Sequence, residues 1–248
     1  MTTGLTLSAR GIPVKRLLLG STSTTHGTGY LDHCEAEMRE LFGAARRVLF
    51  VPYALHDRDA YAARVRERLG RMGLGVDSIH EAVDPVRAVL DAEALFVGGG
   101  NTFRLLKELY GNALLDPIRR RVESGIPYAG TSAGSNVACV TIKTTNDMPI
   151  VEPPSLRALG LVPFNINPHY QDADPASTHM GETRETRIRE FHEENDPVVV
   201  ALREGAILRI EDRRVWLAGT AGARIFFQGR EAREFLPGAS LDFLLEPP

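Results

Sequence analysis

The sequence predicts an α/β protein, with a mostly parallel β-sheet flanked by helices and antiparallel strands toward the C-terminus. Two observations support this class. In the first half, short apolar runs alternate with longer stretches in which apolar residues recur at helical spacing. In the second half, short apolar runs follow one another closely, with turn residues between them. The first pattern is typical of a parallel sheet with helical crossovers and the second of antiparallel hairpins.

In the first half, each expected strand is an apolar run of three to five residues, too short for a helix. The expected strands are Arg16–Leu19, Arg47–Val51, Val76–Ile79, Ala94–Val97 and Pro127–Ala129. Helices are expected between them where the apolar residues lie on one helical face, and at one of these Asp84 precedes Pro85 as a cap. The expected helices are Tyr30–Phe42, Asp57–Met72, Asp84–Leu90, Phe103–Tyr110 and Pro117–Glu123.

Four closely spaced strands are expected after residue 197, and we expect them to form antiparallel hairpins added to the same sheet. These strands are Val198–Ala201, Ala206–Ile210, Val215–Ala218 and Arg224–Phe227. The chain has no linker, internal repeat or low-complexity segment. We therefore expect one domain spanning residues 1–248.

The composition excludes several classes of protein. The chain has 248 residues and a net charge of −3, without the basic surface that a nucleic-acid partner requires. Its two cysteines, Cys34 and Cys139, cannot form a disulfide framework. The polar segment Met1–Pro13 lacks the apolar core of a signal peptide, and no apolar run is long enough to span a membrane. These features predict a cytoplasmic protein without a membrane partner.

The pentapeptide Gly130-Thr131-Ser132-Ala133-Gly134 matches G-x-S-x-G, the turn that exposes a nucleophilic serine between a strand and a helix. An apolar strand precedes it and the helical stretch Ala133–Cys139 follows it. The amide of Ala133 can then donate to an oxyanion, and a second donor can come from Gly98–Gly100 at the end of another strand. The alternative is that Ser132 only caps the helix.

A serine nucleophile needs a base, and the base needs a carboxylate partner. His169 is the best candidate for the base because it follows the strand-like run Phe164–Asn167. In open α/β sheets, sites form outside the carboxyl ends of the strands. Asp147 and Glu204 are both candidates for the acid. The sequence order alone does not choose between them.

A metal site is an alternative for the same region of the chain. Possible ligands crowd one stretch, namely His169, Asp172, Asp174, His179 and Glu182. Their spacing matches no zinc-binding pattern. We therefore expect neither a metal nor another cofactor.

Five blocks, in order along the chain, resemble the S51 family of serine peptidases, whose peptidase E members are aspartyl dipeptidases. These blocks are Val97–Thr102, Gly130–Gly134, Thr144–Val151, Ile166–His169 and Gly181–Glu185. The resemblance implies a fold like that of the class I glutamine amidotransferases, with serine in place of their usual cysteine. It also implies the hydrolysis of small acidic dipeptides that begin with aspartate.

The resemblance implies roles for individual residues. Ser132 would be the nucleophile, His169 the base and Glu204 the acid, with oxyanion donors at Gly100 and Ala133. Four further residues would contact substrate, namely Arg184, Asp147, Glu182 and Asn101.

Arg184 would bind the aspartate side chain through a bidentate pair. Without the resemblance, Arg184 would be assigned to a charged helix face over Glu182–Glu194. Glu182 would bind the free amino group. Asp147 matches an acidic position of the family, and no particular group of the substrate is assigned to it.

Three other functions agree with the same residues. One is a cyanophycinase, which shares the S51 arrangement and recognises aspartyl units of a polymer. Another is an α/β-hydrolase esterase that uses Ser132, Asp147 and a later histidine. The third is a catalytically silent protein that binds small acidic metabolites. A homodimer is compatible with all of them.

Overall fold

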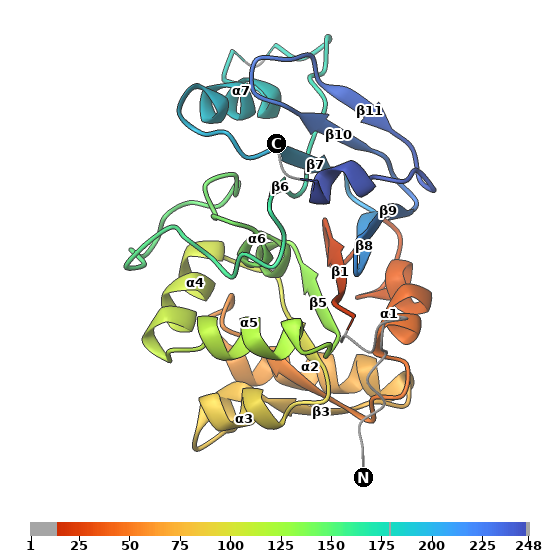
Figure 1. Cartoon of the computed structure of the whole chain (residues 1–248), viewed down its shortest axis with the longest axis vertical. Coiled ribbons are helices and arrows are strands. Elements are labelled where there is room, and N and C mark those ends of the chain that lie inside the picture. The colour runs from red at the N-terminus through yellow and green to blue at the C-terminus, as the bar shows by residue number, and fades with distance from the viewer. Residues whose placement is uncertain (1–13, 179, 247–248) are drawn as a thin grey trace.

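The computed structural model describes residues 14–178 and 180–246 (Figure 1). The segment Met1–Pro13 and His179, both discussed above, lie outside these residues. The described chain forms a mixed α/β structure, which confirms the predicted fold class. None of its helices is both long and apolar enough to cross a membrane.

The larger sheet has seven strands in the order β3-β2-β4-β5-β1-β8-β9. Its first five strands are parallel, and β8 and β9 pair antiparallel at the β1 edge. The strands are β1 (Arg16–Gly20), β2 (Arg47–Val51), β3 (Gly75–Ser78), β4 (Leu95–Val97), β5 (Tyr128–Thr131), β8 (Ala206–Glu211) and β9 (Arg214–Gly219).

Helices cover both faces of this sheet because successive strand residues point to opposite faces. Leu18 packs with the buried residues of α1 and α2 on one face, and Leu17 and Leu19 pack with those of α3 to α6 on the other. The helices are α1 (Glu35–Phe42), α2 (Arg58–Arg71), α3 (Pro85–Asp91), α4 (Thr102–Gly111), α5 (Leu115–Glu123) and α6 (Ala133–Ala138). The first of these begins later than expected, because residues Asp32–Cys34 form a 3₁₀ turn.

A second sheet of four strands lies above the first in Figure 1, with the order β11-β10-β7-β6. Its strands are β6 (Asn165–Asn167), β7 (Val199–Leu202), β10 (Ala223–Phe226) and β11 (Arg233–Phe235), and α7 (Arg184–Glu194) lies beside them. A 3₁₀ turn, Asp242–Leu245, packs on β9.

The expectation that all C-terminal strands extend one sheet is therefore wrong for β7 and β10. The free edge of β1 accepts a single neighbour, and β8 occupies it. The chain turns at Arg203–Gly205, where Gly205 has a φ of 90°, and this turn carries β7 away from the larger sheet. There β7 pairs parallel with β6 and antiparallel with β10.

Candidate active site

Ser132 lies at the turn between β5 and α6, in a backbone conformation that L-residues rarely adopt. Its φ is 50° and its ψ is −109°. The flanking glycines are required by close packing: a Cβ at Gly130 would lie 2.5 Å from the carbonyl oxygen of Gly134. A Cβ at Gly134 would lie 2.1 Å from the carbonyl oxygen of Val97. This strained turn presents the serine side chain outside the carboxyl ends of the strands.

The hydroxyl group of Ser132 does not cap the helix. Ser132 occupies the N-cap position of α6, but its side chain makes no capping hydrogen bond. Its Oγ lies 3.0 Å from Nε2 of His169 instead. The backbone N–H of Ser132 donates to the carbonyl oxygen of Gly20, at 3.0 Å, which ties the turn to β1. The arrangement is that of a serine paired with a base.

His169 lies just past β6 and also has a positive φ, 52°. Its Nδ1 is 2.8 Å from Oε1 of Glu204, which lies in the turn between β7 and β8. The two side chains are 36% and 52% exposed. When Nδ1 carries the proton and its N–H donates a hydrogen bond to Glu204, the lone pair of Nε2 faces the hydroxyl group of Ser132. A proton can then pass from Ser132 to His169.

Ser21, directly after β1, connects the segments that carry the histidine and the glutamate. Its Oγ accepts the backbone N–H of His169, at 2.8 Å, and donates to the carbonyl oxygen of Leu202, at 2.9 Å. Ser21 is fully buried. The hydroxyl group therefore holds His169 in its unusual backbone conformation and fixes the end of β7, two residues before Glu204. The sequence carries no signal for this role.

An ion-pair network supports the same two segments from the solvent side. Arg203 lies next to Glu204 and binds Asp172 through two hydrogen bonds of 2.7 Å each. It also pairs with Glu234 of β11, at 3.0 Å. The neighbouring guanidinium holds the pKa of the Asp172 carboxyl below its usual value. Since Asp172 follows His169 by three residues, the network joins the base segment to the acid segment.

Two backbone amides near Ser132 have no partner among the described residues, those of Gly100 and Ala133. Ala133 is the first residue of α6, where amides have no intrahelical acceptor. Gly100 has a φ of 135°, and a Cβ there would lie 2.6 Å from the carbonyl oxygen of Ala54. Neither amide is engaged by the described residues, and their role as oxyanion donors stays a prediction.

Asp147 and Asn101 lie together at the N-terminus of α4, and neither hydrogen-bonds to His169. Oδ2 of Asp147 accepts two hydrogen bonds from Thr102, one from its backbone N–H at 2.7 Å and one from its hydroxyl group at 2.6 Å. It accepts a third from the hydroxyl group of Thr145, at 3.1 Å. Asn101 caps the helix by accepting the N–H of Arg104 at 3.0 Å and donates to the carbonyl oxygen of Met148 at 2.9 Å. Both residues therefore fix the loop after residue 144.

An open cleft of about 390 Å³ contains Ser132 and His169, and Gly100 and Asp147 also line it. Its volume is at the lower end of the range for small-molecule sites, roughly 300–1,000 Å³. Two residues of α2 that the sequence does not single out, Tyr61 and Arg64, complete one side of it.

Arg184 and Glu182, which are expected to contact substrate, are not among the described residues that line this cleft. Arg184 is the first residue of α7, capped by Thr183, and partial burial lowers the pKa of its guanidinium. It forms no ion pair with any residue in the described part of the chain. Glu182 lies 3.4 Å from Arg187.

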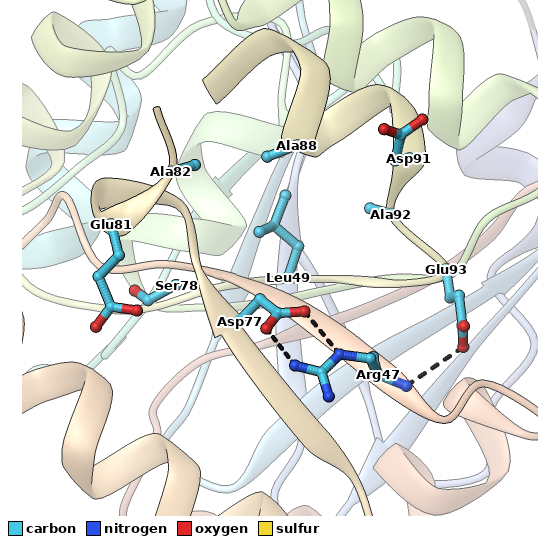
Figure 2. Close-up of a pocket in the computed structure, with 10 residues that line it drawn as sticks. All are labelled: Arg47, Leu49, Asp77, Ser78, Glu81, Ala82, Ala88, Asp91, Ala92 and Glu93. Carbon is cyan, nitrogen blue, oxygen red and sulfur yellow. Dashed lines mark hydrogen bonds and ion pairs between the residues drawn. The ribbon is translucent and has the colours of Figure 1, made fainter. Parts of the chain in front are cut away.

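A second cavity, of about 420 Å³, lies between the β3 edge of the sheet and α3 (Figure 2). Figure 2 shows that Arg47 bridges two of its acids: its side chain binds Asp77 and its backbone N–H donates to Glu93. None of its lining residues is shared with the cleft at Ser132. Three of its acids pair with arginines, as Asp77–Arg47, Glu81–Arg66 and Asp91–Arg87. Its described lining residues include no serine–histidine pair like that of the Ser132 cleft.

One cluster of potential metal ligands occurs in the described chain, formed by Asp59, His80 and Glu81, whose ligand atoms lie within 4.8 Å of one another. Glu81 pairs with Arg66, and Nδ1 of His80 lies 2.8 Å from the hydroxyl group of Ser78. The cluster is remote in sequence from Ser132, and none of its members lines the cleft.

Comparison with known proteins identifies the family. The family model for peptidase family S51 matches residues 17–218. Peptidase E of Streptomyces coelicolor is 53% identical over 230 residues, which cover 93% of this chain and 95% of that protein. A probable alpha-aspartyl dipeptidase of Drosophila melanogaster is 48% identical, covering 94% of this chain and 98% of that protein.

Two solved structures share the fold. The crystal structure of a peptidase from an acI-B1 Actinobacterium has a TM-score of 0.71 at 18% identity, covering 92% of this chain and 96% of that one. A putative peptidase E from Listeria monocytogenes has a TM-score of 0.63 at 23% identity, covering 83% and 98%. The family resemblance predicted from the five sequence blocks is confirmed, and the chain belongs to peptidase family S51.

Proposed function

We propose that this protein is a serine dipeptidase that hydrolyses dipeptides with an N-terminal aspartate. One observation carries the proposal: the hydrogen-bonded series from Ser132 Oγ to His169 Nε2, at 3.0 Å, and from His169 Nδ1 to Glu204 Oε1, at 2.8 Å. The substrate class is supported by the relatives, which are named peptidase E and alpha-aspartyl dipeptidase.

In the first half of the reaction, Ser132 attacks the carbonyl carbon of the aspartyl residue while His169 accepts its proton. Glu204 orients the imidazole ring and stabilises its positive charge. The amides of Gly100 and Ala133 donate to the oxyanion of the tetrahedral intermediate, and loss of one such donor typically lowers kcat by about 10²–10³-fold.

The intermediate then collapses, the peptide C–N bond breaks, and His169 gives its proton to the departing amino group. This leaves an aspartyl ester on Ser132. In the second half, His169 takes a proton from a water molecule, which attacks the ester. The second tetrahedral intermediate then collapses, His169 returns the proton to Oγ of Ser132, and aspartate leaves.

We assign the acid to Glu204 rather than to Asp147. Glu204 accepts from the imidazole, whereas Oδ2 of Asp147 is already occupied by three hydrogen bonds from Thr102 and Thr145. An esterase with the order serine, aspartate, histidine would need Asp147 in the position that Glu204 occupies. The geometry therefore favours the order serine, histidine, glutamate.

The substrate carries charges that the site must match. We assign its side-chain carboxylate to Arg184, whose guanidinium has no acidic partner in the described chain. This role requires the segment between His169 and α7 to bring Arg184 over the cleft. The free amino group is assigned to Asp147, because it lines the cleft, rather than to Glu182, which pairs with Arg187. Asn101 supports Asp147 by fixing the same loop.

The names of the relatives, peptidase E and alpha-aspartyl dipeptidase, favour a dipeptide over a polymer such as cyanophycin. A cytoplasmic location is part of the proposal. Cys34 and Cys139 are free and buried, which suits a reducing compartment.

The proposal is tested with a panel of dipeptides that share leucine as the second residue. Purified protein is incubated with Asp-Leu, Asn-Leu, Glu-Leu and Ala-Leu, and released leucine is measured. We expect rapid cleavage of Asp-Leu and little cleavage of the other three. Equal cleavage of all four would contradict aspartyl specificity. Failure to cleave any of them would support the silent binding protein instead.

A further inference from the structure

The cleft at Ser132 contains a cation that the mechanism above does not use. Arg64, in the second turn of α2, lines the cleft together with Ser132, His169 and Asp147. No other arginine or lysine does so within the described residues. A dipeptide with an N-terminal aspartate carries two carboxylates, and the proposed function assigns only the side-chain carboxylate, to Arg184, which lies outside the lining of the cleft. Arg64 is therefore a cation available to the other carboxylate of such a substrate.

Two aromatic rings hold the guanidinium of Arg64 in place. Its Cζ atom lies 4.7 Å from the ring centroid of Tyr30 and 4.9 Å from that of Tyr61. Tyr61 is only 3% exposed, and its ring is fixed against the glycine loop: a Cβ at Gly98 would lie 2.3 Å from its hydroxyl oxygen. The position of Arg64 is thus tied to the loop that carries the Gly100 amide. A guanidinium stacked on aromatic rings keeps its N–H edge free for a planar anion.

Arg64 differs from the other arginines of α2 because it has no acidic partner. The other four each pair with at least one carboxylate, as Arg58–Glu108, Arg66–Glu81, Arg68–Asp32, Arg68–Glu35 and Arg71–Glu67. Asp32 and Glu67 also line a small cavity that Arg64 borders, but Arg68 and Arg71 already bind them. Within the described chain, Arg64 has neither an ion pair nor a hydrogen bond from its guanidinium.

We infer that Arg64 binds the terminal α-carboxylate of the dipeptide. The enzyme would then select substrates whose second residue carries a free C-terminal carboxylate. The inference rests on the proposed dipeptidase function. The terminal carboxylate is common to all dipeptides, whereas the second side chain varies. Arg64 is exposed at an open cleft, so it can hold the carboxylate while that side chain points to solvent. A planar carboxylate matches the guanidinium fork in two parallel hydrogen bonds.

Asp147 supports this orientation because it offers the opposite charge in the same cleft. A dipeptide has its ammonium group and its terminal carboxylate on opposite sides of the scissile bond. A site with one anion and one cation therefore favours one direction of binding. An additional residue at the C-terminus would displace the carboxylate from Arg64, so tripeptides are expected to be weaker substrates.

The test compares Arg64→Gln with the unmodified enzyme on Asp-Leu and on Asp-Leu amide, which lacks the terminal charge. The unmodified enzyme should prefer Asp-Leu in kcat/KM by about 10- to 100-fold, the range for a charged hydrogen bond. Arg64→Gln should lower kcat/KM for Asp-Leu by a similar factor and leave that for the amide within about threefold, so that the preference disappears. Arg64→Lys keeps the charge but not the fork, and should restore part of the preference.

Arg66→Gln is the matched control, because Arg66 lies on the same helix, pairs with Glu81 and does not line the cleft. It should behave like the unmodified enzyme. An unchanged preference for the acid over the amide in Arg64→Gln overturns this inference alone. The inference is also overturned if Arg64→Gln loses the preference for Asp-Leu over Asn-Leu but keeps the preference for Asp-Leu over Asp-Leu amide. Arg64 would then bind the aspartate side chain. An unmodified enzyme that cuts neither substrate overturns the proposed function as well.

Discussion

Glu204→Gln removes the charge from the group that contacts His169 while keeping its shape. In the present structure, Oε1 of Glu204 lies 2.8 Å from Nδ1 of His169 and the Glu204 side chain is 52% exposed. Two unit charges at 4 Å near a protein surface interact by about 4 kcal/mol, and solvent exposure reduces this to about 2–3 kcal/mol. That loss alone lowers kcat by about 30- to 150-fold. Loss of the preferred imidazole tautomer adds to it, so we expect a total decrease of about 10²–10³-fold.

The assay is steady-state release of leucine from Asp-Leu, with Asp147→Asn as the comparison. Glu204→Gln should change the melting temperature little, because the side chain is half exposed. Asp147→Asn weakens three hydrogen bonds at the start of α4 and should lower the free energy of unfolding by about 1–3 kcal/mol. If Glu204→Gln keeps kcat within threefold of the unmodified enzyme and folded Asp147→Asn loses more than 100-fold, the assignment of the acid is wrong.

Three further predictions concern two buried contacts near the site and the two cysteines. Ser21→Ala leaves the N–H of His169 without its acceptor. We expect the free energy of unfolding, measured by urea denaturation, to fall by about 1–3 kcal/mol and kcat to fall as well. An unchanged kcat would contradict the positioning role. Gly134→Ala forces a Cβ against backbone and should destabilise the fold by about 3 kcal/mol or more in the same assay. Burial raises the pKa of Cys34 to about 12 and also raises that of Cys139, so a maleimide should label the native protein at least about 100-fold more slowly than the urea-unfolded protein.

The parts of the fold that sequence predicts well are those set by local rules. The turn at Ser132 is an example, since its glycines are required by contacts that any strand-to-helix nucleophile turn makes. The strands of the first half follow from short apolar runs. The separation of β7 and β10 into a second sheet depends instead on which strand occupies the β1 edge. No periodicity within the strands carries that information.

The parts of the candidate site that sequence leaves open depend on tertiary contacts. Glu204 and Asp147 are equally plausible acids by order, and only folding brings Glu204 to His169. The hydrogen bond between Ser21 and His169 joins residues 148 positions apart. Arg64 resembles its neighbours in a helix with five arginines. Only the folded structure distinguishes it, because the other four arginines of α2 form ion pairs with carboxylates and Arg64 forms none within the described residues.

The role of Ser132 is the central claim, and the measurement that tests it most directly is the turnover of Asp-Leu by Ser132→Ala. The substitution removes one oxygen atom and should leave the circular dichroism spectrum and the melting temperature unchanged. We expect kcat to fall by more than about 10⁴-fold, as when a serine nucleophile is removed from other serine peptidases. A folded Ser132→Ala protein that keeps more than about a hundredth of the original turnover would contradict the assignment of Ser132 as the nucleophile.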